Sequence, residues 1–496
     1  MSATPTDLGE APPAPVRTGA VVPVLASAGI TVALMQTLVI PLVPELPRLL
    51  NASAAGTAWA ITATLLAAAV ATPIMGRLGD MYGKRRMLLI SIGMLIAGSV
   101  VAALSSSLVP MIAGRALQGL AAGVIPLGIS IMRDELPAEK LGTATAQMSA
   151  SLGVGGALGL PTAALLAENF NWHTLFWLSA ALGAIVFVLV VRFVPESAVR
   201  SGGRFDVPGG LGLSIGLISL LLAISQGADW GWTGGRTLGL FALAVVALLT
   251  WGWWERRTSE PLVDLRTTVR PQVLLTNLAS MVFGFAMFAM SLVLPQLLQM
   301  PKATGFGLGQ SMLASGLVMG PSGLVMLVAA PFSAKISKTR GPKVTLMLGA
   351  LVVAAGYGVG SVLMSSVWQL VLVSLLIGAG IGLAYGAMPA LIMSAVPVSE
   401  TAAANSFNTL MRSIGTSVSS AVAGVILANL TISLGGYTLP SQSAFRVVLL
   451  IGAGAALTAL AIASFIPRSP SQVSAEEGEG ALQDELGGGL VVTREG

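Results

Sequence analysis

Two arginines, Arg115 and Arg412, stand inside long stretches of the chain that contain no acidic residue. An arginine inside lipid costs at least about 2.5 kcal/mol unless it faces a cavity or finds a partner, so each is a candidate functional residue. Arg412 shares one helical face with three polar residues at spacings of three and four positions, namely Asn405, Asn408 and Thr416. Such a face would form a polar stripe able to hold a neutral or anionic group of a ligand.

Amide side chains at other positions extend this candidate binding surface. Gln118 stands three residues after Arg115 and therefore shares its helical face. A single amide within a span is as often a helix-to-helix contact as a ligand contact, and both interpretations stay open. The candidate substrate-binding residues are Gln36, Arg115, Gln118, Gln147, Asn277, Asn408 and Arg412.

A further group of residues lies in the sequence GRLGDMYGKRR at positions 76–86. We predict that Gly76, Asp80 and Gly83 lie in a tight turn, where the glycines allow close helix approach or a positive φ. Asp80 could cap the N-terminus of another helix, which stabilises an anion by about 0.3–1 kcal/mol. Together with Arg85 these residues form a candidate conformational latch. The other interpretation of the basic residues is a solvated loop.

Enzymatic and metal chemistry have no candidate residues in this sequence. It contains no cysteine and a single histidine, His173, and it has no phosphate loop of the form GxxxxGK[ST]. No nucleophile and base stand at usable spacing, so we expect no enzyme activity, no cofactor and no metal. His173 follows Trp172, and we expect this pair to anchor the chain at a membrane interface.

Proton coupling would need an acid at the rim of an apolar stretch, because an arginine cannot release a proton at usable pH. Asp134 and Glu45 are the leading candidates, ahead of Glu168 and Asp80. Burial of such a carboxylate during a conformational change would favour its protonated form. Cavity arginines without a neighbouring acid also favour a neutral or anionic amphiphile over an organic cation as the ligand.

The apolar stretches set the fold class. The chain is 54% apolar and 9% charged, which leaves too little polar surface for a globule in water. Fourteen stretches of about twenty residues without an acidic residue can each cross a ~30 Å hydrocarbon core, and inside lipid such segments must be helices. We therefore predict an all-α polytopic membrane protein. The spans are expected at about 18–43, 56–76, 87–106, 109–131, 142–166, 172–192, 209–227, 237–254, 272–296, 310–333, 344–363, 367–392, 404–428 and 444–466.

Basic residues divide unevenly between the two sides of the membrane. Only a few lie on the loops of one side, namely Arg48, Arg236, Lys302 and Arg446. Because loop Lys and Arg residues stay in the cytoplasm, we expect both termini there and a cell membrane location, most simply a bacterial plasma membrane.

An internal repeat divides the chain into two related halves. Pro73 through Gly83 matches Pro331 through Gly341, with the proline and the glycine displaced by the same number of residues. We expect an N-terminal six-helix half at 18–192, two inserted helices and linkers at 193–271, and a C-terminal six-helix half at 272–466. The composition of residues 1–17 and of the acidic residues 467–496 is typical of disordered tails.

With these features the chain resembles the major facilitator superfamily, and within it the fourteen-helix drug:proton antiporter family. GRLGDMYGKRR is similar to the superfamily's loop signature, and RALQGLAAG at 115–123 is similar to its second motif. GVGGALGLP at 153–161 resembles the motif associated with antiport, although Leu160 separates its last glycine from the proline. The resemblance implies that the helix capped by Asp80 is the thirteenth span.

The resemblance favours a proton-coupled secondary active exporter, an antiporter of amphipathic small molecules or drugs that works by alternating access as a monomer. Its expected partners are such an amphiphile, protons and membrane lipid, with no nucleic acid. The departure in the third motif leaves an importer or facilitator of a metabolite open, and a lipid-type carrier on the same fold is also open. A receptor would need an ordered domain outside the membrane, and no segment of the sequence predicts one.

Overall fold

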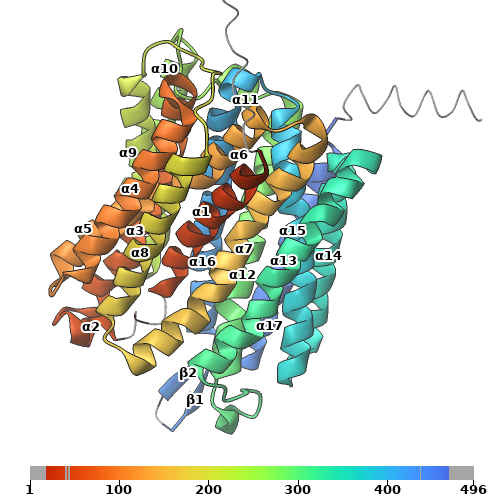
Figure 1. Cartoon of the computed structure of the whole chain (residues 1–496). Coiled ribbons are helices and arrows are strands. Elements are labelled where there is room, and N and C mark those ends of the chain that lie inside the picture. The colour runs from red at the N-terminus through yellow and green to blue at the C-terminus, as the bar shows by residue number, and fades with distance from the viewer. Residues whose placement is uncertain (1–17, 40–41, 43–44, 436, 468–496) are drawn as a thin grey trace, which may run out of the picture.

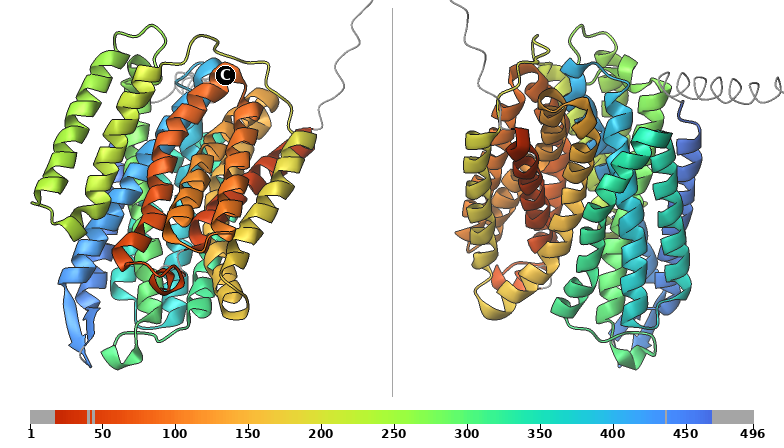
Figure 2. Two further views of the ribbon diagram at one scale, coloured as in Figure 1. Left: turned by 90° about the vertical axis from the view of Figure 1, so that its left-hand side faces the viewer. Right: turned by 45° about the vertical axis from the view of Figure 1, so that its right-hand side comes forward.

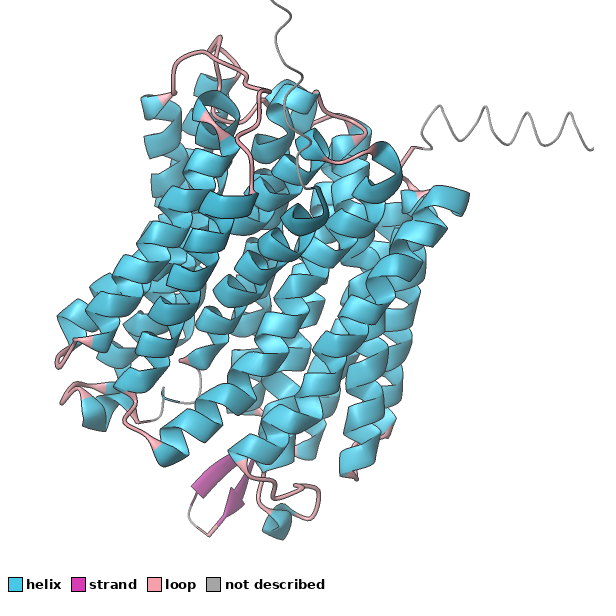
Figure 3. Ribbon diagram, in the orientation of Figure 1, coloured by secondary structure: helices cyan, strands magenta, loops and turns pink. Residues whose placement is uncertain are grey.

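The computed structural model describes residues 18–39, 42, 45–435 and 437–467, and the two predicted tails lie outside this range except for residue 467. Within the described residues, fourteen helices are long and apolar enough to cross a membrane, so the predicted all-α fold is confirmed. Figure 3 shows that helices make up almost all of the bundle. The spanning helices are α1 (Thr18–Leu38), α3 (Ala54–Tyr82), α4 (Lys84–Ala103), α5 (Leu108–Gly119) with α6 (Val124–Glu135), α7 (Ala138–Asn169), α8 (His173–Phe193), α9 (Val207–Trp230), α10 (Gly235–Glu255), α12 (Pro271–Gln299), α13 (Met312–Arg340), α14 (Pro342–Val362), α15 (Val367–Met393), α16 (Thr401–Asn429) and α17 (Gln442–Ser464).

The helix ends differ from the expected span ends in both directions. The first helix ends at Leu38, before the predicted end at residue 43, whereas α13 continues to Arg340, well past residue 333. Charged residues mark where lipid ends, but a helix continues into water as long as its backbone hydrogen bonds are satisfied. The structure also contains short helices α2 (Leu46–Leu49) and α11 (Leu265–Thr268), and an antiparallel hairpin of β1 (Thr431–Leu434) and β2 (Tyr437–Pro440) that the sequence analysis did not predict.

The helices from α1 to α8 lie together in the body of the molecule, and the helices from α12 to α17 lie beside them, as Figure 1 shows; we call these two groups the first half and the second half. In the first half α1 packs on α7 and α4 on α8, and in the second half α14 packs on both α15 and α17. The halves meet along α7 with α13 and along α3 with α16. The first of these contacts is close enough that a Cβ on Gly323 would lie 2.3 Å from the carbonyl oxygen of Gly153. Small residues therefore let the two halves approach backbone to backbone.

The inserted helices α9 and α10 form a hairpin at the edge of the bundle, which is clearest in the left view of Figure 2. α9 packs against α3 of the first half and α16 of the second half, as well as against α10. Its leucines share one buried cluster with Ala69 of α3 and Leu410 of α16. Because α9 contacts both halves, any rocking between them must slide or break one of these contacts.

Two ends of the bundle can be distinguished by their loops (Figure 1). At one end lie the turns from α3 to α4 and from α13 to α14, with Lys84, Arg133, Lys338 and the start of α16; we call it the basic end. At the opposite end lie α2 and the β1–β2 hairpin; we call it the hairpin end. The described chain begins and finishes at the basic end, in keeping with an even number of spans.

Candidate functional site

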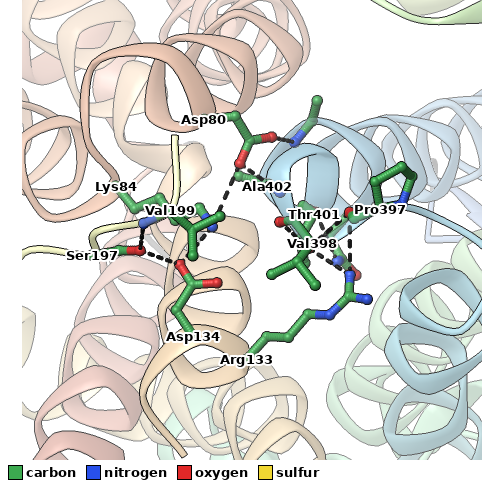
Figure 4. Close-up of polar contacts among 12 residues, drawn as sticks. Asp80, Lys84, Arg133, Asp134, Ser197, Val199, Pro397, Val398, Thr401 and Ala402 are labelled. Carbon is green, nitrogen blue, oxygen red and sulfur yellow. Dashed lines mark hydrogen bonds and ion pairs between the residues drawn. The ribbon is translucent and has the colours of Figure 1, made fainter. Parts of the chain in front are cut away.

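Asp80 joins the two halves at the basic end. Its buried carboxylate accepts hydrogen bonds from the backbone N–H groups of Ala402, at 3.2 Å, and Ala403, at 2.8 Å, as Figure 4 shows for Ala402. These N–H groups belong to the first turn of α16, where a helix has no partners of its own for them. An anion at a helix N-terminus is also stabilised by the helix dipole. The predicted candidate latch residue therefore bonds to the thirteenth span in this conformation.

Only one of the three residues predicted to lie in the tight turn is found there. Gly76 and Asp80 lie within α3, so the predicted tight turn is wrong for them, and only Gly83, with a φ of 118°, stands in the turn. The helix extends through them because their backbone groups still make hydrogen bonds within the helix, up to the bond from Gly83 N–H to the carbonyl oxygen of Gly79. A Cβ on Gly76 would lie 2.2 Å from the Oγ of Ser406, so Gly76 permits the close approach of α3 and α16.

Lys84 binds two carboxylates at the same end of the bundle. Its Nζ lies 2.6 Å from Oδ2 of Asp134 and 3.7 Å from Oδ1 of Asp80, and all three side chains are buried. Ser197 donates a hydrogen bond of 2.5 Å to the same Oδ2 of Asp134, whose Oδ1 has no partner among the described residues. The candidate proton carrier Asp134 is thus one member of a buried network of charges.

Arg133 makes a second polar contact between the halves. Its guanidinium donates to Oγ1 of Thr401 at 2.5 Å and to the carbonyl oxygens of Met393 and Val396 at 2.8 Å and 3.2 Å. Met393 is the last residue of α15, so the cation stands where that helix leaves its carbonyl groups unpaired. Arg133 and Asp80 therefore bond to facing ends of two consecutive helices of the second half, α15 and α16.

Arg85, the fourth predicted latch residue, turns away from Asp80. Its Nη2 donates to the carbonyl oxygen of Val191 at 2.6 Å, near the end of α8. Its backbone N–H, together with that of Arg86, is capped by the carboxylate of Glu196. These bonds hold α4 against the first half's own α8 and do not reach the second half.

In the membrane interior, Arg115 is fully buried within the first half. Its Nε donates to the carbonyl oxygen of Ala60 at 3.1 Å and its Nη1 to Oε1 of Gln118 at 2.7 Å. Gln118 in turn donates to Oγ of Ser99 at 2.8 Å. The candidate binding residues Arg115 and Gln118 are therefore brought together, but in this conformation they bond to each other and to the neighbouring helices α3 and α4 of the first half.

Arg412 of α16 has a different environment. Its Cζ lies 4.7 Å from the ring centroid of Tyr385, a cation–π contact, and its side chain is partly exposed. Within the described part of the chain it makes no ion pair or side-chain hydrogen bond. Gln36 and Gln147 are likewise partly exposed, without hydrogen bonds to the described residues. These three side chains have free hydrogen-bonding capacity.

Asn408 and Asn277 bond to each other between α16 and α12. Nδ2 of Asn408 donates to Oδ1 of Asn277 at 2.9 Å, and Ser280 donates to Oδ1 of Asn408 at 2.9 Å. Both amides are buried, and Nδ2 of Asn277 has no partner among the residues described. In this conformation the pair is a helix-to-helix contact within the second half.

The second candidate proton carrier, Glu45, lies far from this network. It is exposed beside α2 at the hairpin end, with Arg48 at 3.0 Å. The side chain of Glu168, another candidate, is not among those described. His173 stacks on Trp172 with ring centroids 3.7 Å apart, and its Nε2 lies 3.0 Å from the carbonyl oxygen of Ser105.

Sequence reasoning missed several residues of the site. Lys84 and Arg133 were not singled out as site residues, although Lys84 lies within the motif at 76–86 and Arg133 directly precedes the candidate Asp134. Tyr385 had no signal beyond being a rare tyrosine within an apolar stretch. The capping of α4 by Glu196 had one general signal, because the first N–H groups of every helix need hydrogen-bond acceptors.

With the fold and the site in place, the comparisons assign the class of protein. Residues 25–420 match the Major Facilitator Superfamily, and the chain belongs to this family of transporters. The Multidrug resistance protein Stp of Mycobacterium tuberculosis is 26% identical over 78% of this chain and 71% of its own length. The Tetracenomycin C resistance and export protein of Streptomyces glaucescens is 28% identical over 80% of this chain and 74% of its own length.

Multidrug resistance protein 3 of Bacillus subtilis is 23% identical over 75% of this chain and 72% of its own length. Among solved structures, the human organic anion transporter MFSD10 (TETRAN) aligns with a TM-score of 0.64 at 16% identity, covering 90% of this chain and 99% of that one. This likeness supports the fold. The protein is thus a multi-pass membrane transporter with relatives in drug resistance and export, and the predicted resemblance is confirmed.

Proposed function

We propose that this transporter is a proton-coupled antiporter that exports amphipathic small molecules by alternating access. Drug resistance and export in the names of its relatives support the direction of transport and the class of substrate. The observation that carries the mechanism is the pair of hydrogen bonds from Asp80 to the first turn of α16. They join the two halves at the basic end.

The basic end is proposed to face the cytoplasm, because Lys and Arg residues on loops stay on that side of a membrane. The conformation described above is then closed toward the cytoplasm by Asp80 and Arg133. Rupture of both contacts would let the halves separate at this end and open a space between them toward the cytoplasm, as expected for a rocking transporter.

The substrate is proposed to be a neutral or anionic amphiphile whose polar group binds near Arg412. Arg412 is a partly exposed residue near the middle of a span, and its guanidinium has no acid or hydrogen-bond acceptor among the described residues, which favours an anion or a hydrogen-bond acceptor as its partner. Gln36 and Gln147 could supply further hydrogen bonds. Arg115 and Gln118 would reach the substrate only if the bonds within their own half rearrange.

Asp134 is the proposed proton carrier. A proton on this carboxylate would replace its ion pair with Lys84, freeing the cation to interact with Asp80 alone. That exchange would strengthen the attraction between Lys84 and Asp80, whose carboxylate bonds to α16, and would so link protonation to the contact between the halves. Glu45 fits the role less well, because an exposed ion pair contributes little and its charge touches neither interface.

Transport into inside-out membrane vesicles tests the direction and the coupling. Acidifying the vesicle interior should drive accumulation of an amphipathic dye, and a protonophore that collapses the gradient should stop it. Accumulation only in right-side-out vesicles would instead support an importer. Movement of labelled lipid between the leaflets of proteoliposomes, without dye accumulation, would support the lipid-type carrier.

A further inference from the structure

A small cavity lies at the basic end, between the start of α16 and the loop that joins the inserted hairpin to the second half. Its wall includes Arg77 of α3, Asn277 of α12 and Glu400, the residue before α16. The cavity has a volume of about 180 Å³. Drug-sized ligands usually occupy about 300–1,000 Å³, so this space suits a molecule of amino-acid size. Arg412 is not among the described residues that line it, and the cavity is therefore separate from the site proposed for the amphiphile.

Asn277 has a hydrogen-bond donor that the protein leaves unused. The residue is 2% exposed, and its Oδ1 accepts a bond of 2.9 Å from Nδ2 of Asn408. Its own Nδ2 is buried and has no partner among the described residues. An unpaired buried donor costs about 1–3 kcal/mol, so a ligand that brings an acceptor to this amide group is stabilised there.

Two charged groups of the same cavity wall are also unpaired. The guanidinium of Arg77 and the carboxylate of Glu400 make no hydrogen bond or ion pair within the described part of the chain, and they are not paired with each other. Both residues are partly exposed. Arg77 attracts the carboxylate of Asp80, but only from beyond the distance of an ion pair. The cavity therefore offers donors from Arg77 and Asn277 and an acceptor from Glu400.

The other acids of the cavity wall are already bonded to their own loop. The carboxylate of Glu260 accepts a hydrogen bond from the backbone N–H of Arg204. Asp264 accepts bonds of 2.8 Å and 2.9 Å from the first turn of α11. Their charges still add to that of Glu400 and outnumber the single cation Arg77, which disfavours a ligand that carries only a negative charge. A ligand that carries only a positive charge would leave Arg77 unpaired.

We propose that this cavity binds a small zwitterion, with its carboxylate toward Arg77 and Asn277 and its ammonium group toward Glu400. The carboxylate supplies the acceptors that the guanidinium and the amide need. The ammonium group supplies donors for the glutamate. A molecule with only one of these groups leaves part of the wall unpaired and binds more weakly.

The bound zwitterion holds the basic end closed. Among the described residues of the wall, Arg77 alone belongs to the first half, whereas Asn277 and Glu400 lie on the side of the second half. Opening of this end draws α3 away from α16 and takes the cavity apart. A ligand that binds only the closed form shifts the equilibrium toward that form, so the zwitterion slows transport.

Protection of an introduced cysteine tests the site in the purified full chain, because the sequence has no cysteine. Ala404→Cys places a thiol on the cavity wall, and Ala138→Cys places one at the exposed start of α7, at the same end. Leucine is the zwitterionic probe, leucinamide lacks its carboxylate, and N-acetylleucine lacks its ammonium group. We expect about 10 mM leucine to slow the reaction of Ala404→Cys with a maleimide about threefold or more and to leave Ala138→Cys unchanged. The other two probes should protect less.

Two substitutions show whether each charged group meets its part of the probe. With Glu400→Gln the advantage of leucine over N-acetylleucine should disappear, and with Arg77→Gln its advantage over leucinamide should disappear. Glu139→Gln, a change of an exposed acid at the same end, should leave both advantages intact. Protection by none of the probes would mean that the cavity holds water alone and would overturn the proposal. Protection by leucinamide or N-acetylleucine that equals that of leucine would overturn it as well.

The effect on the halves is measured at Ser406→Cys, a buried position at the interface that is not among the described residues lining the cavity. Leucine should slow the reaction of this thiol about threefold, because it holds α3 against α16. An unchanged rate at Ser406→Cys, together with protection at Ala404→Cys, would contradict the closing effect. If Ala404→Cys does not fold, Thr268→Cys supplies a second thiol on the same wall.

Discussion

The two halves share one fold but differ in what their corresponding turns do. The turns from α3 to α4 and from α13 to α14 each hold a glycine with positive φ, Gly83 at 118° and Gly341 at 88°. In the first half Asp80 precedes this turn, is buried and bonds to α16. At the matching position the second half has Lys338, which is exposed. The repeat thus preserves the backbone of the turn, while of these two matching residues only Asp80, and not Lys338, makes a hydrogen bond to the opposite half within the described part of the chain.

The two intramembrane arginines also differ in how many polar contacts they make. Arg115 in the first half donates to the carbonyl oxygen of Ala60 and to Gln118, whereas the ring of Tyr385 is the only partner that the structure describes for the guanidinium of Arg412 in the second half. The polar groups of the first half therefore bond to its own helices and, through Asp80, to α16. In the second half the guanidinium of Arg412 has no such bonds among the described residues, and for this reason we propose that Arg412 contacts the ligand.

The largest expected difference between the two turns is in stability, and substitution of Lys84 tests it. We expect Lys84→Ala to lower the free energy of unfolding by about 3–5 kcal/mol, because it leaves the buried charges of Asp134 and Asp80 unpaired. Lys338→Ala, in the matching turn, should change it by no more than about 0.5 kcal/mol. Thermal unfolding of the purified proteins measures both, and equal losses would show that the two turns are energetically alike.

Substitution of the two arginines should affect different properties, namely stability for Arg115 and ligand binding for Arg412. Arg115→Ala should destabilise the protein by about 2 kcal/mol or more, because it opens a cavity and leaves Gln118 without its donor. Arg412→Ala should instead weaken binding of an anionic amphipathic dye about tenfold or more, the loss expected for a charge-assisted hydrogen bond. A matched cationic dye is the control. Tighter binding of the cationic dye that survives both substitutions would show the charge argument to be wrong.

The latch gives a smaller effect on transport. Asp80→Asn keeps the side-chain size but removes the charge that faces the N-terminus of α16, a loss of about 1.5 kcal/mol. Turnover should slow about tenfold while the affinity for substrate stays nearly unchanged, because the change affects the conformational step. Lys338→Asn should transport within about twofold of the parent. Initial rates across a range of dye concentrations give the turnover and the affinity for substrate. If Asp80→Asn transports at the parental rate, Asp80 has no role in the conformational step.

Much of the fold follows from local sequence features. Uncharged stretches of sufficient length predict each spanning helix, because lipid forces every backbone group to bond within its own segment. The bond of Asp80 to the thirteenth span could be expected from the motif together with the family resemblance. The extent of α3 through Gly76 and Asp80 could not, because the sequence marks where lipid ends and not where the helix ends.

The charge network could not be predicted for a different reason. Lys84 and Asp134 lie on α4 and α6, and nothing in the sequence specifies how those helices rotate about their axes. The same holds for Arg77 and Asn277, which line one cavity although α3 and α12 belong to different halves. Long-range pairs of this kind depend on packing, which is decided by shape and not by the pattern of any one segment.

The central claim, that Asp80 closes the basic end by bonding to α16, can be tested at Ser406. Its buried Oγ has no hydrogen-bond partner among the described residues and faces Gly76 across the interface, so Ser406→Cys is a mild change that places a thiol under the latch. The account predicts slow reaction of this thiol with a soluble maleimide, and a rate about tenfold higher when Asp80→Asn is added. Equal rates with and without Asp80→Asn would contradict it.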